Sequence, residues 1–171
     1  MFMTFGWKKG LLISVLLVMI CCSGCQNDPA YTQDSLMEMI QKELNVTGEL
    51  QYGATCGKAR LGNDDAVIWY YTTGNEQKNI YIPVEVKVVG EARYKFVSFL
   101  ETTEPAQDIV TADWQNGCCI FVNNPECVTV EVTKNEHVWN EYNDHAIYPM
   151  IYYYEGLVSC RYLNAEGNDV K

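Results

Sequence analysis

The feature that most constrains the fold of this chain is an alternation of apolar and polar residues with a period of two. Between Ile80 and Val88 every second residue is aliphatic, and the residues between them include Glu85 and Lys87. Residues 128–133 repeat the pattern with valines. Because successive side chains of a β-strand point to opposite faces, this period predicts strands that bury one face in a sheet.

Turn residues divide much of the remaining chain into further short strands. Connections this short join antiparallel neighbours, whereas parallel strands need helical crossovers. We therefore expect a mainly β fold, an antiparallel β-sandwich with immunoglobulin-like layers and one N-terminal α-helix. The alternative is an α+β fold in which the helix packs on an antiparallel sheet. The further strands are expected at residues 66–73, 94–101, 109–114, 118–122, 148–154 and 159–163.

One amphipathic helix is expected from Ser35 to Asn45. Ser35 and Glu38 have the spacing of an N-terminal capping box, which places the helix start at Ser35. The apolar residues of this segment recur at helical intervals and predict a face that packs against the domain. They are Leu36, Met39, Ile40 and Leu44.

The start of the chain has the order of an export signal. Lys8 and Lys9 precede an apolar run at residues 11–20, which is well short of the roughly 20 residues needed to span a bilayer core. The run leads into Cys-Ser-Gly-Cys at residues 22–25, which resembles a bacterial lipobox with cysteine in place of the usual leucine. The resemblance covers residues 8–25. An ordinary signal peptide and an uncleaved anchor are the alternatives.

The resemblance to a lipobox implies that Cys25 carries a diacylglyceryl group, is cut from Gly24 and becomes the acylated N-terminus. Two acyl chains hold a protein firmly on a membrane, whereas one chain is marginal. The expected organisation is a signal peptide at 1–24, a tether at 25–33 and a single mostly β domain at 34–171. The protein would then lie on the cell membrane, facing away from the cytoplasm.

The charge of the chain argues against nucleic acid as a partner. There are 12 Lys and Arg against 22 Asp and Glu, giving a formal charge of −10. Cleavage after Gly24 would remove two lysines and no acid, leaving −12. Such a body lacks the basic surface that neutralises phosphates. A protein or glycan partner at the envelope is expected instead.

A tight hairpin is predicted at Asn116-Gly117, because this dipeptide suits both positive-φ positions of a type I′ turn. Cys119 would then lie opposite Trp114 and face the core. Cys118 would point to the other face and be the more accessible thiol of the two. The expected core face consists of Val110, Ala112, Trp114, Cys119 and Phe121.

No metal or cofactor site is assigned from the sequence. Five cysteines follow Cys25, an odd number whose pairing the sequence leaves open. None of these five cysteines forms a C-x-x-C with another, and adjacent Cys118 and Cys119 point to opposite faces of a strand, which disfavours zinc. The loops at 62–65 and 164–169 offer oxygen ligands but lack the calcium-loop pattern.

No catalytic residue is assigned either, and three classes of function stay open. A thiol-dependent envelope hydrolase would need Cys118 or Cys160 beside His137 or His145. A structural accessory subunit of an envelope complex would show a flat apolar patch. The preferred hypothesis is a binding or interaction module whose exposed aromatic rings contact a partner. The candidate surface for this role is formed by Trp69, Tyr71, Tyr152 and Tyr154.

Overall fold

The computed structural model describes residues 29–56, 64–72 and 79–171. The predicted export signal and Cys25 lie outside these residues. Within them the chain forms one helix and twelve strands, and all strand pairs are antiparallel. The mainly β class with one N-terminal helix is therefore confirmed. The elements are β1 (Ala30–Tyr31), α2 (Gln33–Glu43), β2 (Gln51–Cys56), β3 (Asp65–Tyr71), β4 (Tyr81–Gly90), β5 (Arg93–Phe99), β6 (Thr102–Ala106), β7 (Ile109–Trp114), β8 (Gly117–Val122), β9 (Thr129–Lys134), β10 (His137–Tyr142), β11 (Met150–Glu155) and β12 (Ser159–Leu163).

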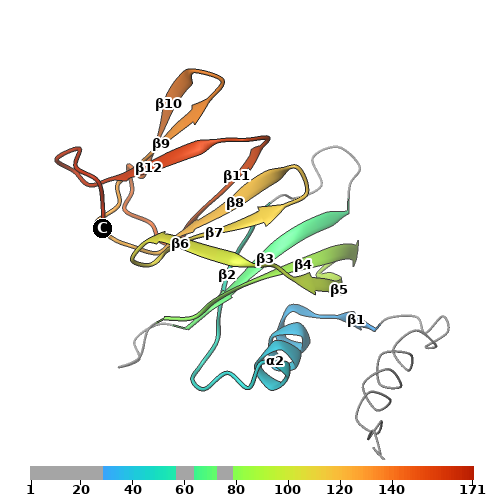
Figure 1. Ribbon diagram of the computed structural model, residues 1–171. Helices are drawn as coiled ribbons and strands as arrows, with labels where there is room; N and C mark the ends of the chain where they lie inside the picture. The colour runs from blue at the N-terminus through green and yellow to red at the C-terminus, as the bar shows by residue number, and fades with distance from the viewer. Residues whose placement is uncertain (1–28, 57–63, 73–78) are drawn as a thin grey trace, which may run out of the picture.

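The strands form three sheets that stack in layers (Figure 1). Sheet A has the strand order β1-β5-β4-β3-β2, sheet B the order β11-β8-β7-β6, and sheet C the order β10-β9-β12. Helix α2 covers one face of sheet A, sheet B packs on the other face, and sheet C packs on the far face of sheet B. Sheets A and B form the expected sandwich, the helix lies on an antiparallel sheet, and sheet C adds a third layer of strands.

Helix α2 begins earlier than the sequence pattern indicated. Thr32 is the N-cap, and its side chain accepts a hydrogen bond from the backbone N–H of Ser35 at 3.2 Å. The Ser35 hydroxyl in turn accepts from the backbone N–H of Thr32 at 2.8 Å. The capping box is therefore Thr32 with Ser35, and the prediction that Ser35 with Glu38 begins the helix was wrong. Ser35 with Glu38 has the usual sequence of a capping box and Thr32 with Ser35 does not, but only Thr32 has the extended backbone of an N-cap.

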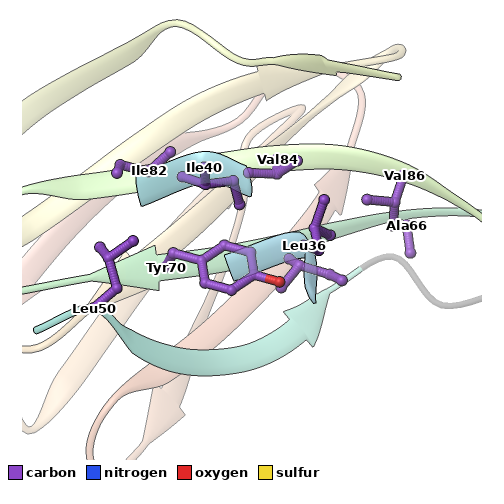
Figure 2. Close-up of a cluster of buried hydrophobic side chains, with 9 residues drawn as sticks. Leu36, Ile40, Leu50, Ala66, Tyr70, Ile82, Val84 and Val86 are labelled. Atoms are coloured by element: carbon purple, nitrogen blue, oxygen red, sulfur yellow. The ribbon is translucent and has the colours of Figure 1, made fainter. Parts of the chain in front are cut away.

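The buried stripe of α2 packs on sheet A, as the helical periodicity predicted (Figure 2). Leu36 and Ile40 lie one turn apart and are fully buried, whereas Leu44 beyond the helix end is exposed. In this cluster the tyrosine ring of Tyr70 lies beside the two helix residues, and burial raises its pKa. The fully enclosed members are Leu36, Ile40, Leu50, Ala66, Ile68, Tyr70, Ile82, Val84 and Val86.

Strand β3 is buried on both faces, which is typical of a strand covered on two sides. Its even-numbered residues point toward α2 and its odd-numbered residues toward sheet B. The ring of Phe121 on β8 packs against Trp69 and Tyr71, with centroid distances of 5.1 and 5.2 Å. The A–B core consists of Val67, Trp69, Tyr71, Val110, Ala112, Trp114, Cys119 and Phe121.

The hairpin between β7 and β8 turns one residue earlier than predicted. Its turn residues are Gln115 and Asn116, and Gln115 has a φ of 53°. Cys119 therefore pairs with Ala112 instead of Trp114, and this part of the prediction was wrong. Because the partner changes by two positions, every side chain keeps its face. The predicted core face of the hairpin is confirmed.

Gly117 accounts for the shifted turn, because its lack of a side chain lets β8 and β11 lie close together, and it is therefore a strand residue instead of a turn residue. It pairs with Trp114 on one side and with Glu155 of β11 on the other. A Cβ atom at this position would overlap the carbonyl oxygen of Tyr154 and lie 2.9 Å from a ring carbon of Tyr153. The glycine is thus required inside the strand, and the turn falls on the two residues before it.

The third core lies between sheets B and C. Ile120 and Val122 of β8 point away from sheet A and meet Val130 and Val132 of β9. Strand β8, like β3, therefore buries both of its faces. The enclosed members of this core are Ala106, Ile109, Ile120, Val122, Cys127, Val130, Val132, Met150 and Tyr162.

Four strands fall outside the ranges that the sequence pattern indicated. Residues Ala30–Tyr31, assigned to the tether, pair with β5 at the edge of sheet A. Strands β2, β6 and β10 were also missed. In β6 the sequence Thr-Thr-Glu-Pro-Ala offers no apolar alternation. In β10 each face carries both polar and apolar side chains, so that no period of two is visible.

Candidate functional site

Two of the four aromatic residues proposed as a binding surface are core residues. Trp69 is fully buried and Tyr71 is 8% exposed, and both lie between sheets A and B. The indole N–H of Trp69 finds no hydrogen-bond acceptor among the described residues. The prediction that Trp69 and Tyr71 face solvent was wrong, because sheet B covers the face of β3 on which they lie.

The other two residues of that surface, Tyr152 and Tyr154, are half-buried on the face of β11 that meets sheet C. Their rings stack at a centroid distance of 6.0 Å, and Trp139 of β10 meets Tyr154 edge-on at 6.0 Å. Burial raises the pKa of Tyr152 to about 12 and raises the pKa of Tyr154 further. The four predicted rings therefore do not share one exposed surface.

The thiols lie mostly inside the layers. Cys119 is buried in the A–B core, and Cys118 is half-buried on the opposite face, so the prediction that Cys118 is the more accessible of the two is confirmed. Burial, with a second contribution from Cys118, raises the pKa of the Cys160 thiol to about 11. Burial also raises the pKa of Cys127. Since the thiolate is the nucleophile, Cys160 and Cys127 are poorly suited to attack a substrate near neutral pH.

Metal-ligating groups do not gather in the part of the chain that the structure describes. No group of three His, Cys, Asp or Glu side chains there is arranged to hold a metal ion. His137 and His145 are both exposed, the first at the start of β10 and the second in the loop that follows it.

The most exposed of the large apolar side chains lie on sheet C and its connections. Among the described residues, the four most exposed large hydrophobic side chains are Leu157 at 93%, Ile147 at 66%, Tyr142 at 63% and Val138 at 57%. Val138 and Tyr142 belong to β10, and the other two lie in the loops before and after β11. This concentration makes the exposed side of sheet C the candidate interaction surface, since exposed apolar patches mark binding sites.

The β9–β10 hairpin positions the two exposed side chains of β10. Its turn, Asn135–Glu136, has positive φ at both residues, as a type I′ turn requires. Trp139 pairs with Val132 and points into the B–C core. Val138 and Tyr142 have the opposite parity and therefore face outward, with Asn140 between them. The side-chain amide of Asn140 donates to Tyr142 Oη at 2.9 Å.

The loops bring the remaining two apolar residues to the ends of this hairpin. Asn143, directly after β10, exchanges hydrogen bonds with the backbone of Ile147, both at 3.1 Å. At the other end the Lys134 ammonium donates to the carbonyl of Glu155, two residues before Leu157. Exposed apolar side chains therefore stand at both ends of β10 as well as on it.

The charge around β10 is negative. Residues 135–149 contain Glu136, Glu141 and Asp144 and neither lysine nor arginine. The cation of the adjacent strand β9, Lys134, donates to the carbonyl of Glu155, and Arg161 of β12 is bound to Glu131 and to Asp169, each at 3.1 Å. The carboxylate of Glu141 accepts a hydrogen bond from the indole N–H of Trp139 at 3.0 Å. The candidate surface thus combines apolar side chains with a border in which three acids stand against one lysine.

This surface was missed by the sequence reasoning, which looked for clustered aromatic residues. The signal that could have found it is the pair Asn135–Glu136 after the alternating strand β9. A two-residue connection there places residues 137–142 antiparallel to β9 as an edge strand.

Comparison of the chain with family models, with curated proteins and with solved structures gave no significant match. In the described part of the chain, no helix has the length and apolar character needed to cross a bilayer. The fold and the candidate surface therefore define the class: a layered antiparallel β protein with an exposed apolar and acidic edge strand.

Proposed function

We propose that this protein is a lipid-anchored interaction module of the cell envelope, held outside the cytoplasm through Cys25, and that the exposed side of sheet C binds its partner. The observation that carries the binding role is that the four most exposed large apolar side chains of the described residues lie on β10 and in the two loops that join sheets B and C. The lipid anchor is supported by the lipobox-like sequence at residues 22–25.

The layer order supports this division of the molecule into an anchored side and a binding side. Strand β1 begins five residues after Cys25, and an extended chain of that length spans at most about 18 Å. The lipid would therefore hold sheet A and α2 close to the headgroups. Sheet C lies on the other side of sheet B from sheet A (Figure 1) and would face away from them.

The anchor is tested with the full chain by comparing Cys25→Ser with Cys22→Ser. The first variant loses the acyl group and leaves the membrane fraction, whereas the second keeps the Gly24–Cys25 bond and stays there. Fractionation and mass spectrometry of the intact protein measure both. A Cys25→Ser protein that remains in the membrane, and whose mass differs from that of the wild type only by the exchange of sulfur for oxygen, would contradict the anchor.

The binding surface is tested with two exposed strand valines on different sheets. Val138 on β10 is 57% exposed and Val97 on β5 is 44% exposed, so that valine to serine removes a similar apolar group in each case. A partner crosslinked from envelope extract by the full chain should be lost with Val138→Ser and retained with Val97→Ser. If both variants retain the partner equally, the partner does not bind to the exposed side of sheet C.

A structural accessory subunit is the second candidate function, because the same apolar surface would suit permanent burial in a complex. An interaction module releases its partner on dilution, whereas an accessory subunit copurifies with it in a fixed ratio. Size-exclusion chromatography of an extract prepared without crosslinker, run at two protein concentrations, shows whether the partner dissociates on dilution or stays bound in a fixed ratio.

A further inference from the structure

Strand β10 is the outer strand of sheet C, and one of its sides pairs with no described strand. The hairpin closes at the pair Lys134–His137 around a two-residue turn, so that the odd-numbered residues of β10 exchange backbone hydrogen bonds with β9. The N–H of Asn143 continues this pattern by donating to Val128 at 2.9 Å. The backbone N–H and C=O groups of Val138, Asn140 and Tyr142 therefore point to the free side.

The other sheet edges in the described residues carry features that block strand addition. Strand β6 contains Pro105 and an irregular register, β2 is also irregular, and β1 has two residues. The free side of β12 is covered by the C-terminal segment, where the N–H of Val170 donates to Tyr162 at 2.8 Å. Strand β11 lies beside β2. Proteins protect edges in these ways against unwanted pairing.

None of these features is present in β10. Its six residues pair with β9 in continuous register and include no proline, lysine or bulge. Its outward side chains, Val138 and Tyr142, are apolar and exposed. Such an edge is a template to which an extended chain can add a strand.

We infer that the free edge of β10 binds an extended, basic polypeptide segment of the partner as a fourth strand of sheet C. This deepens the proposed function and rests on its binding role, though not on the lipid at Cys25. The backbone groups of the edge supply hydrogen bonds, and apolar side chains of the added strand lie beside Val138 and Tyr142.

The acidic border decides the charge of the added strand. Glu136, Glu141 and Asp144 lie on or next to β10, and the one lysine of the hairpin is Lys134, opposite His137. In an antiparallel pair of two β10 strands centred on Asn140, Glu136 would lie opposite Asp144, and like charges opposite each other on paired strands repel. A basic segment with alternating apolar residues fits both the charge and the exposed side chains.

The experiment compares two substitutions at one position of the full chain in detergent. Asn140→Pro removes an N–H that points to the free edge and leaves the β9 hydrogen bonds intact, since proline is tolerated at such edge positions. Asn140→Ala loses the same amide side chain and keeps the N–H. Equal unfolding midpoints show that both variants retain the fold.

The probe is a labelled alternating lysine–valine peptide as long as β10, and anisotropy measures its affinity. The wild type and Asn140→Ala should bind the peptide, and the affinity of Asn140→Pro should be at least about tenfold lower. This is the loss expected when one backbone hydrogen bond to the peptide is removed and the proline ring clashes with the added strand. A glutamate–valine peptide should not bind. Hydrogen exchange at Asn140 and Tyr142 should slow when the lysine–valine peptide is added.

Equal affinity of Asn140→Pro and Asn140→Ala, or no binding of the peptide to the wild type, overturns strand addition. If the envelope partner is still lost with Val138→Ser in that case, the binding role of sheet C stands and only the mode of binding is wrong. If Val138→Ser also retains the partner, both proposals fail together.

Discussion

Two tyrosine hydroxyls in this protein stand in opposite environments, and removing each should change stability in opposite directions. Tyr154 Oη is buried near the B–C core and has no hydrogen-bond partner among the described residues. Its ring is held by Tyr152 and Trp139, both at centroid distances of 6.0 Å. Burying a hydroxyl without a partner costs about 1 to 3 kcal/mol in protein mutational data. Tyr154→Phe keeps the ring and should raise the free energy of unfolding by about 1 kcal/mol or more.

Tyr81 provides the matched control with the same chemical change. Its hydroxyl donates to Asp108 Oδ1 at 2.6 Å, and the same oxygen accepts from Asn79 Nδ2 at 2.9 Å. Burial first, and then the hydrogen bond to Asp108, raises the pKa of Tyr81. Hydrogen bonds to charged groups contribute about 1.5 to 3 kcal/mol. Tyr81→Phe should therefore lower the free energy of unfolding by about 2 kcal/mol.

Urea unfolding at neutral pH, followed by tryptophan fluorescence, measures both variants against the wild type. The midpoint should rise for Tyr154→Phe and fall for Tyr81→Phe, with unchanged dependence on urea concentration. Destabilisation by Tyr154→Phe as large as that by Tyr81→Phe would refute the reasoning. It would mean that the Tyr154 hydroxyl has a hydrogen-bond partner in solution.

Two further predictions concern a glycine and a thiol. Gly117→Ala should destabilise the protein by about 3 kcal/mol, because the new Cβ overlaps the Tyr154 carbonyl and forces β8 and β11 apart. Urea unfolding measures this loss of stability. A loss below about 0.5 kcal/mol would contradict the predicted overlap. The Cys160 thiol should lower stability at alkaline pH, since its pKa is about 11 when folded and 9.0 ordinarily. Between those values the unfolded chain has released the proton that the folded chain retains, so stability falls as pH rises through that window. Cys160→Ala should make the fall shallower in urea titrations at pH values across the window, and an unchanged slope would exclude this cause.

The face on which a residue lies was easier to predict from the sequence than its exact partner. The alternation in β4 and β9 is clear because one face of each is lined by aliphatic residues. The central ones, Ile82, Val84, Val86, Val130 and Val132, are buried, whereas Ile80 at the start of the predicted strand is 42% exposed. In the β7–β8 hairpin the core face was correct although the partner of Cys119 was wrong. A change of two positions in pairing keeps the alternation, so the prediction of the face survived an error in the turn.

Exposure of aromatic residues could not be predicted in the same way. The sequence Ala-Val-Ile-Trp-Tyr-Tyr in β3 is apolar throughout, which means that both faces are covered, but the reasoning assumed that one face had to be outside. Trp69 is buried because a second sheet lies on its face, and that sheet comes from residues far along the chain. The residues next to Trp69 in the sequence therefore do not indicate that a distant sheet covers it.

The layer order explains why the proposed binding surface lies on a segment with a weak sequence signal. Sheet A is covered by α2 on one face and by sheet B on the other, and sheet B is covered by sheets A and C. Strands in these inner layers need apolar residues on both faces or in strict alternation, and such patterns are easily recognised. Sheet C has one face that no described element covers, so β10 there can carry polar and apolar side chains without regular period. On this uncovered face of β10, Val138 and Tyr142 are exposed because nothing in the described chain is placed to cover them, whereas Trp139 on the other face packs against the B–C core. The proposed contact with a partner is made by the uncovered face.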